Sequence, residues 1–204
     1  MGVFMVSWIT VHNGGTYRIN AAKEQQQKMK EYLKDHNLTK DKFKQRVIEY
    51  TIEILGSLGI DLDTANKYLI FPINKCEQNG INIDYKNIQK EFDLADVRDI
   101  VWMKFTSSGS LGVVASSNDV NFQKPSTIKE YDETQQNGRW KYNTSGIIID
   151  YLGETWDESF VLIFPIKSIP KGMTRHGVEK RIGNYLIDKG IPILDYYSHR
   201  IGGK

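Results

Sequence analysis

The chain is 204 residues long and 40% hydrophobic, which is enough to build a globular core and excludes a wholly disordered chain. Its 27 basic and 25 acidic side chains leave a net charge of +2, and its one cysteine, Cys76, excludes an internal disulfide. With no secretory signal pattern and no apolar run of membrane-spanning length, the sequence predicts a cytoplasmic protein without a membrane partner.

The first forty residues are predicted to form a hairpin and then a helix. Residues 3–11 and 16–19 flank the turn pair Asn13-Gly14, a combination typical of two antiparallel strands. Asn20 is a residue type that caps helices, and the apolar spacing after it predicts a helix over residues 21–36.

A second helix is predicted to start after Thr39 and to end at Gly59. Its apolar residues recur at helical spacing, in the order Phe43, Val47, Tyr50, Ile54, Leu55 and Leu58. Cations are unfavourable at a helix start because of the helix dipole, so the basic residues there indicate either an anionic partner or chance. These residues are Lys40, Lys42, Lys44 and Arg46.

Strands and one helix are predicted in the middle of the chain. Residues 67–73 and 99–105 have strand patterns, and residues 84–95 have a short helical one. Residues 106–112 are rich in serine and glycine, as phosphate-binding loops are, but such a loop must lead into a helix. Because residues 113–115 have the pattern of a return strand, we expect 106–112 to be a hairpin turn.

The last sixty residues predict a hairpin followed by a strand–helix–strand unit. Two apolar runs, 146–152 and 160–166, flank an acidic turn and predict the hairpin. The run 160–166 also opens the unit, which continues with a helix over 174–189 and a strand over 191–197. If the two strands are parallel, the crossover is right-handed and the chain returns to the level where the helix began.

One short sequence occurs twice. Leu69-Ile70-Phe71-Pro72-Ile73 recurs as Leu162-Ile163-Phe164-Pro165-Ile166. A duplicated half would produce such an echo, but the flanks match poorly. Two buried strands that end alike are therefore the favoured explanation.

Together these elements predict an α+β (mixed α/β) fold. It has a central mixed sheet of about five to seven strands, two N-terminal amphipathic helices and a C-terminal strand–helix–strand unit. One domain, 1–204, is expected. The alternative division has two sub-lobes, with the hairpin and helices in 1–60 and the sheet core in 61–204.

Charge is segregated along the chain. Residues 23–47 hold eight basic and four acidic side chains, and residues 164–204 hold eight and three. The segment 48–163 between them has a net charge of −8. Two basic ends around an acidic middle favour an anionic partner such as nucleic acid if the ends share a face, and the alternative is an ordinary solvated surface.

The predicted strand–helix–strand unit gathers basic groups at one end. Open α/β sheets usually bind ligands there, and free N–H groups at a helix start attract anions. We expect the side chains of Arg175 and His176 to lie within about 10 Å of those of Ser198, His199 or Arg200. The residues predicted to bind an anion or nucleic acid are Lys167, Lys171, Arg175, Lys180, Tyr197 and Arg200.

Two catalytic arrangements are compatible with the sequence. His176 and His199 are candidates for a general acid and base in phosphodiester cleavage without metal, with Lys171 or Arg175 stabilising the developing charge. A nuclease that uses Mg²⁺ instead needs carboxylates and a lysine on neighbouring strands. The triplet Asp84-Tyr85-Lys86 has that short pattern, but chance produces about two or three such triplets in a chain of this composition.

A metal site is also conceivable at the acidic turn. Asp150 and Glu154, with Asp157 and Glu158 nearby, are the candidate ligands of a divalent cation. The alternative is a solvated hairpin tip. No motif identifies a reaction or a cofactor, so the sequence leaves open whether the protein is an enzyme.

The functional hypothesis is an intracellular protein that interacts with nucleic acid, with a phosphodiester-cleaving nuclease of restriction or defence type as its enzymatic form. The alternative is a non-enzymatic regulator or inhibitor, encoded by a phage or mobile element, that binds a protein partner. In that case the acidic middle and exposed aromatics such as Trp140 and Trp156 provide the contacts.

Overall fold

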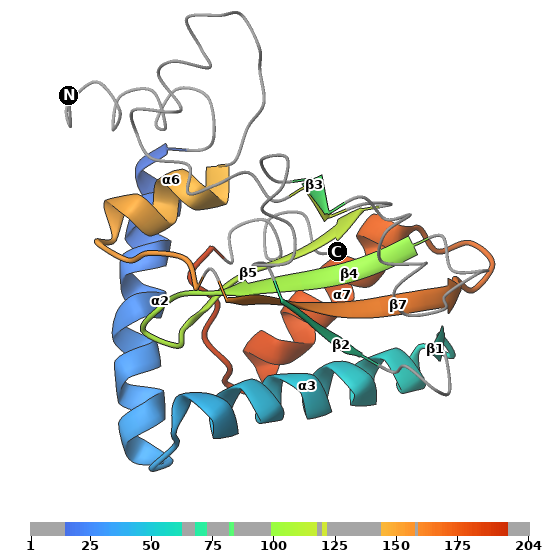
Figure 1. Ribbon diagram of the computed structural model, residues 1–204, viewed down its shortest axis with the longest axis horizontal. Helices are drawn as coiled ribbons and strands as arrows, with labels where there is room; N and C mark the ends of the chain where they lie inside the picture. The colour runs from blue at the N-terminus through green and yellow to red at the C-terminus, as the bar shows by residue number, and fades with distance from the viewer. Residues whose placement is uncertain are drawn as a thin grey trace, which may run out of the picture.

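The computed structural model describes residues 15–62, 68–72, 82–83, 99–117, 120–121, 144–157 and 159–195 (Figure 1). These residues form an α+β fold in which helices pack on an antiparallel sheet. In chain order the elements are α2 (Gly15–Asp35), α3 (Lys40–Ser57), β1 (Asp61–Leu62), β2 (Leu69–Pro72), β3 (Asn82–Ile83), β4 (Asp99–Phe105), β5 (Leu111–Ser117), β6 (Val120–Asn121), α6 (Thr144–Tyr151), β7 (Phe160–Ser168) and α7 (Arg175–Asp188).

Three long strands make up the centre of the sheet, in the order β7, β4, β5. Val101 of β4 lies opposite Phe164 of β7 on one side and Ser116 of β5 on the other. The short strands β1 and β2 pair one after the other along the remaining edge of β7, and β3 pairs with β6 separately. The predicted mixed sheet of five to seven strands is not supported by the described residues, because every pairing in them is antiparallel and only β7, β4 and β5 are long.

The repeated sequence lies on two paired strands. Leu69 of β2 is opposite Ile163 of β7, and Phe71 is opposite Val161. The two copies are therefore neighbours in one sheet. The pairing does not distinguish a duplication from two strands of similar composition, so that choice stays a prediction.

One face of the sheet is covered by α3 and α7. Alternate residues of β4, Val101, Met103 and Phe105, point toward these helices and are at most 3% exposed. Phe43, Val47 and Leu55 of α3 and Val178, Ile182 and Leu186 of α7 complete this core. The 3.6-residue spacing of the helices and the two-residue spacing of the strand thus bury matching apolar faces.

The opposite face carries a smaller apolar cluster of Val113, Ile149, Trp156 and Leu194. The indole of Trp156 lies on β5 at Gly112, where a Cβ would be 2.3 Å from a Trp156 ring carbon. The buried Lys104 places Nζ 4.4 Å from the centre of the same ring. Trp156 therefore closes this face of the sheet, and only glycine allows it to approach so closely.

Helix α2 connects the two layers along one side of the sheet (Figure 1). Met29 is buried in the larger core, and Tyr32 contacts the Phe43 ring of α3 edge to face. Gln26 donates to the carbonyl of Leu152 just after α6, at 3.2 Å. The polar face of α2 carries alternating charges. No described helix combines the length and apolarity needed to cross a bilayer.

Polar contacts near the helix ends join α3 to α7. Lys189 Nζ lies 3.5 Å from a carboxylate oxygen of Glu53. A hydrogen bond from Tyr185, followed by the charge of Lys189, lowers the pKa of Glu53. The same contacts raise the pKa of Lys189, with the Tyr185 hydrogen bond as the largest cause. These groups fix the crossing of the two helices at the surface of the core.

The N-terminal prediction is wrong at one point. Residues 16–19 belong to α2, which begins at Gly15, so they are not a return strand and Asn20 does not cap the helix. The predicted strand 3–11 lies outside the described residues. A turn pair such as Asn13-Gly14 indicates a hairpin only where two strands are available to pair, and here the residues after it continue into an amphipathic helix.

The predicted hairpin of 146–152 and 160–166 is also wrong. Residues 144–151 are helix α6, and the pairing partners of β7 are β4 on one edge and β1 and β2 on the other. A short apolar run does not distinguish a strand from a buried helix. Because both edges of β7 are occupied, 146–152 has no place in the sheet and packs across its face through Ile149.

The strand–helix–strand unit is confirmed in its first two parts. Strand β7 and helix α7 form as predicted, and Gly190 follows the helix with a φ of +79°. Residues 191–195 do not form a strand parallel to β7. Instead the N–H groups of Leu194 and Asp195 donate to the carbonyls of Leu111 and Gly112 at the start of β5. Tyr196 and Tyr197 lie outside the described residues.

Several local predictions are confirmed. Thr39 accepts a hydrogen bond from the N–H of Lys42 and caps α3, and Gly59 follows the helix with a φ of +66°. Strand β4 has the predicted bounds, and 106–110 is a turn that leads into strand β5 rather than into a helix. The predicted strand 67–73 is observed as β2. The predicted helix 84–95 lies outside the described residues.

Candidate functional site

The start of α7 lies at one end of the sheet. There β7 ends at Ser168, β5 ends at Ser117 and β4 begins at Asp99, as the pairs Asp99–Ile166 and Ile100–Ser117 show. Thr174 caps the helix, with its hydroxyl accepting a hydrogen bond from the N–H of Gly177 at 3.0 Å. The sheet therefore fixes the position of the loop and of the first turns of α7.

Cationic side chains are concentrated in residues 167–181 at this end. We call it the α7 basic surface and define it as Lys167, Lys171, Arg175, His176, Lys180 and Arg181. Four of the six side chains are exposed and two, those of Arg175 and Lys180, are half-buried. Residues 167–181 contain one carboxylate, that of Glu179.

Glu179 points inward. It is 8% exposed, and its Oε2 accepts a hydrogen bond from the hydroxyl of Ser116 on β5 at 2.6 Å. The Nδ1 atom of His176 lies 3.3 Å from the same oxygen, while the imidazole itself is 73% exposed. The negative charge is thus held between helix and sheet, and the solvent-facing groups of the α7 basic surface are cationic or imidazole.

Sequence reasoning missed Glu179 and Ser116. Glu179 stands three and seven residues before Ile182 and Leu186, on the buried stripe of α7, and this spacing was the available signal for its burial. Its partner Ser116 is 63 residues away in sequence. No local pattern connects the two residues, because the contact exists only when α7 packs on β5.

The structure places some predicted site residues together and leaves others undescribed. Lys167 lies at the end of β7, Lys171 in the loop after it, and Arg175, His176 and Lys180 in the first two turns of α7. The predicted partners Tyr197, Ser198, His199 and Arg200 lie outside the described residues. Their approach to Arg175 and His176 is untested, and the geometric reason for expecting it does not hold, because residues 191–195 do not run parallel to β7 but bond to the start of β5, at the end of the sheet away from Glu179 and Ser116.

The candidate metal ligands lie elsewhere. Asp150 is exposed on the last turn of α6, and Glu154 follows that helix, where its carboxylate accepts a hydrogen bond from Gln26 at 2.9 Å. The described part of the chain holds no group of three or more His, Cys, Asp or Glu side chains arranged to bind a metal ion. The triplet Asp84-Tyr85-Lys86 lies outside that part.

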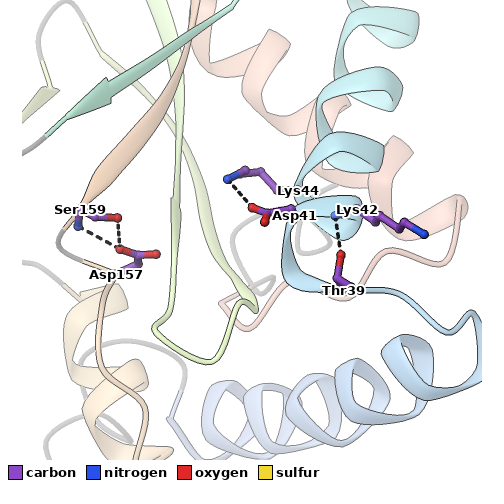
Figure 2. Close-up of polar contacts among 6 residues, drawn as sticks. All are labelled: Thr39, Asp41, Lys42, Lys44, Asp157 and Ser159. Carbon is purple, nitrogen blue, oxygen red and sulfur yellow. Dashed lines mark hydrogen bonds and ion pairs between the residues drawn. The ribbon is translucent and has the colours of Figure 1, made fainter.

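A second group of lysines surrounds the start of α3 at the other end of the sheet. Lys40 Nζ donates to the carbonyl of Ser107 in the β4–β5 turn at 2.7 Å. Lys44 pairs with Asp41 at 3.0 Å and lies 4.8 Å from the centre of the Phe160 ring. Figure 2 shows this pair beside the Thr39 cap.

The segment before β7 lies near the same end. There Asp157 accepts hydrogen bonds from the N–H and hydroxyl of Ser159 (Figure 2). One carboxylate, that of Asp41, and one carbonyl, that of Ser107, thus contact two of the lysines of α3. In this respect the start of α3 differs from the α7 basic surface.

Comparisons with known proteins add nothing to this geometry, since no family model, curated protein or solved structure matches the chain.

Proposed function

We propose that the protein binds nucleic acid through the α7 basic surface. The observation that supports this most is the burial of Glu179, because it leaves five cations and a histidine at one end of the sheet with no exposed carboxylate among residues 167–181. Clustered Lys and Arg side chains are what a phosphate backbone binds, and they release its counterions.

The chemistry of the individual groups fits a phosphate backbone. Arginine presents a planar fork of N–H donors that matches two phosphate oxygens, and Arg181 is exposed on α7. Lysine acts as a mobile point charge, and Lys167 and Lys171 precede the helix on the same end. The cations therefore combine oriented and adaptable phosphate contacts. Recognition of a particular nucleotide sequence would require other groups.

The alternative of a protein-binding regulator loses one of its two proposed anchors. Trp156 is 6% exposed and packs on Gly112, so it does not offer an aromatic surface to a partner. Trp140 lies outside the described residues. The binding of nucleic acid is therefore the function that the described geometry supports better.

The test is direct binding of the purified chain to fluorescently labelled single-stranded RNA, single-stranded DNA and duplex DNA, measured by anisotropy. With about four phosphate contacts, the affinity should fall about fiftyfold for the single strands and about 150-fold for the duplex between roughly 50 and 200 mM salt. Unlabelled nucleic acid should displace the probe, whereas polyglutamate at the same charge concentration should displace it far less. Absence of binding to all three probes at the lower salt concentration would overturn the proposal, and stable capture of a protein partner would then favour the regulator.

A further inference from the structure

The contact between His176 and the buried Glu179 determines which nitrogen of the imidazole carries the hydrogen, and the binding of nucleic acid does not require this. An ionised carboxylate only accepts hydrogen bonds, so the contact at 3.3 Å assigns the hydrogen of a neutral imidazole to Nδ1. The other ring nitrogen, Nε2, then carries the free lone pair. Since the imidazole is 73% exposed, that nitrogen is accessible to a bound ligand.

Strand β5 holds the carboxylate of Glu179 in place. Ser116 donates to the same Oε2 of Glu179 at 2.6 Å, from strand β5. Glu179 also lies on the buried stripe of α7, so its side chain has little freedom to turn away. A base that is oriented by a held third group is the arrangement expected of general-base catalysis.

We propose that His176 is a general base that cleaves RNA bound at the α7 basic surface, with Glu179 and Ser116 as positioning residues. The proposal rests on the proposed function, because the cations of that surface must hold the phosphate beside the imidazole. RNA is the favoured substrate class because its 2′-hydroxyl is a nucleophile already attached next to the phosphorus.

The step balances without an added reactant. Nε2 of His176 takes the proton of the 2′-hydroxyl, and the 2′ oxygen forms a bond to phosphorus. The bond from phosphorus to the 5′ oxygen of the next nucleotide breaks, and that oxygen takes a proton from water. The resulting hydroxide is neutralised by the proton on His176. The products are a 2′,3′-cyclic phosphate and a free 5′-hydroxyl, and Lys171 or Arg181 stabilises the charge on the phosphate oxygens.

The experiment uses the full chain, a labelled single-stranded RNA and a DNA of the same sequence, in buffer with chelator. The RNA should be cut to fragments ending in 2′,3′-cyclic phosphate, and the DNA should be bound but not cut. His176→Ala should lower the cleavage rate about a hundredfold or more while RNA affinity changes less than about threefold. His36→Ala, at an exposed histidine after α2, is the matched control and should cleave normally.

The positioning residues have their own readout. Glu179→Gln keeps the shape of the side chain and should lower kcat about tenfold per RNA-binding molecule, with the number of such molecules counted by stoichiometric RNA titration. Loss of folding would instead lower that number and leave kcat per RNA-binding molecule unaltered. RNA binding without cleavage, cleavage only with divalent cation, or full activity in His176→Ala would each overturn this inference and leave the proposed function standing. Absence of RNA binding would overturn the proposed function itself.

Discussion

Helices α3 and α7 begin in the same way and present different surfaces. Each is capped by a threonine whose hydroxyl accepts from the N–H three residues later, Lys42 for Thr39 and Gly177 for Thr174. Each first half is also rich in basic residues and contains one carboxylate. The difference lies in the position of that carboxylate relative to the core.

At α3 the carboxylate belongs to Asp41, whose side chain is 89% exposed and pairs with Lys44. At α7 it belongs to Glu179, whose side chain is 11% exposed and faces β5. Similar local composition thus gives exposed cations with an exposed carboxylate among them in one case, and exposed cations without one in the other. The count of charges in a sequence does not determine the field at a surface, because a buried charge contributes differently from an exposed one.

The two helix starts also lie at opposite ends of the sheet. Lys40 of α3 contacts the β4–β5 turn, whereas Glu179 of α7 contacts the far end of β5. A strand of seven residues separates these points by about 20 Å. Within the described residues, the two basic segments therefore do not merge into one site, and they can be tested independently.

The largest expected effect is a loss of RNA affinity when charges of the α7 basic surface are reversed. Lys171→Glu with Arg181→Glu should weaken RNA binding about a hundredfold at low salt, which is about 2.7 kcal/mol, and should reduce the slope of log affinity against log salt by about 2. The matched pair Lys30→Glu with Lys42→Glu, at exposed lysines of α2 and α3, should weaken it less than about threefold. Equal losses in the two variants, measured by anisotropy, would mean that only net charge matters.

Removing the carboxylate of Glu179 should lower the free energy of unfolding more than removing that of Asp41. Glu179→Ala should lower the free energy of unfolding by about 2 kcal/mol, because it leaves the Ser116 hydroxyl without its acceptor and opens space beside β5. Asp41→Ala removes an exposed ion pair and should cost about 0.5 kcal/mol. Urea unfolding measures both values. A Glu179→Ala protein as stable as the wild type would show that desolvation of the carboxylate cancels what its hydrogen bonds contribute.

The smallest difference between the two ends should come from the caps. Thr39→Ala and Thr174→Ala each leave a first-turn N–H group without its side-chain acceptor and should each cost about 1 kcal/mol. The corresponding serine variants keep an acceptor and should stay within a few tenths of a kcal/mol of the wild type. Thermal or urea unfolding tests this pair. A cost at Thr174 that is much larger than at Thr39 would indicate that the hydroxyl also supports the His176–Glu179 contact.

Local signals in the sequence determined the elements that carry the fold. Thr39 and Gly59 bound α3, Gly190 ends α7, and the apolar pattern of 99–105 gives β4, since caps, left-handed glycines and side-chain periodicity act within a few residues of chain. The cations of the candidate site were recognisable for the same reason. They occupy the loop before α7 and its first turns, where the position of each side chain follows from the helix start.

Contacts between distant segments decided the rest. Residues 146–152 have an apolar run that fits a strand or a helix, and they became helix α6 because β4, β1 and β2 already pair with both edges of β7. Residues 191–195 bond to the first carbonyls of β5 rather than form a parallel strand. The contact of Glu179 with Ser116 joins residues 63 positions apart. A sequence shows which groups are present, but their pairing and burial depend on which surfaces remain free once the sheet and helices have packed. This packing decided which charges the protein presents to a partner.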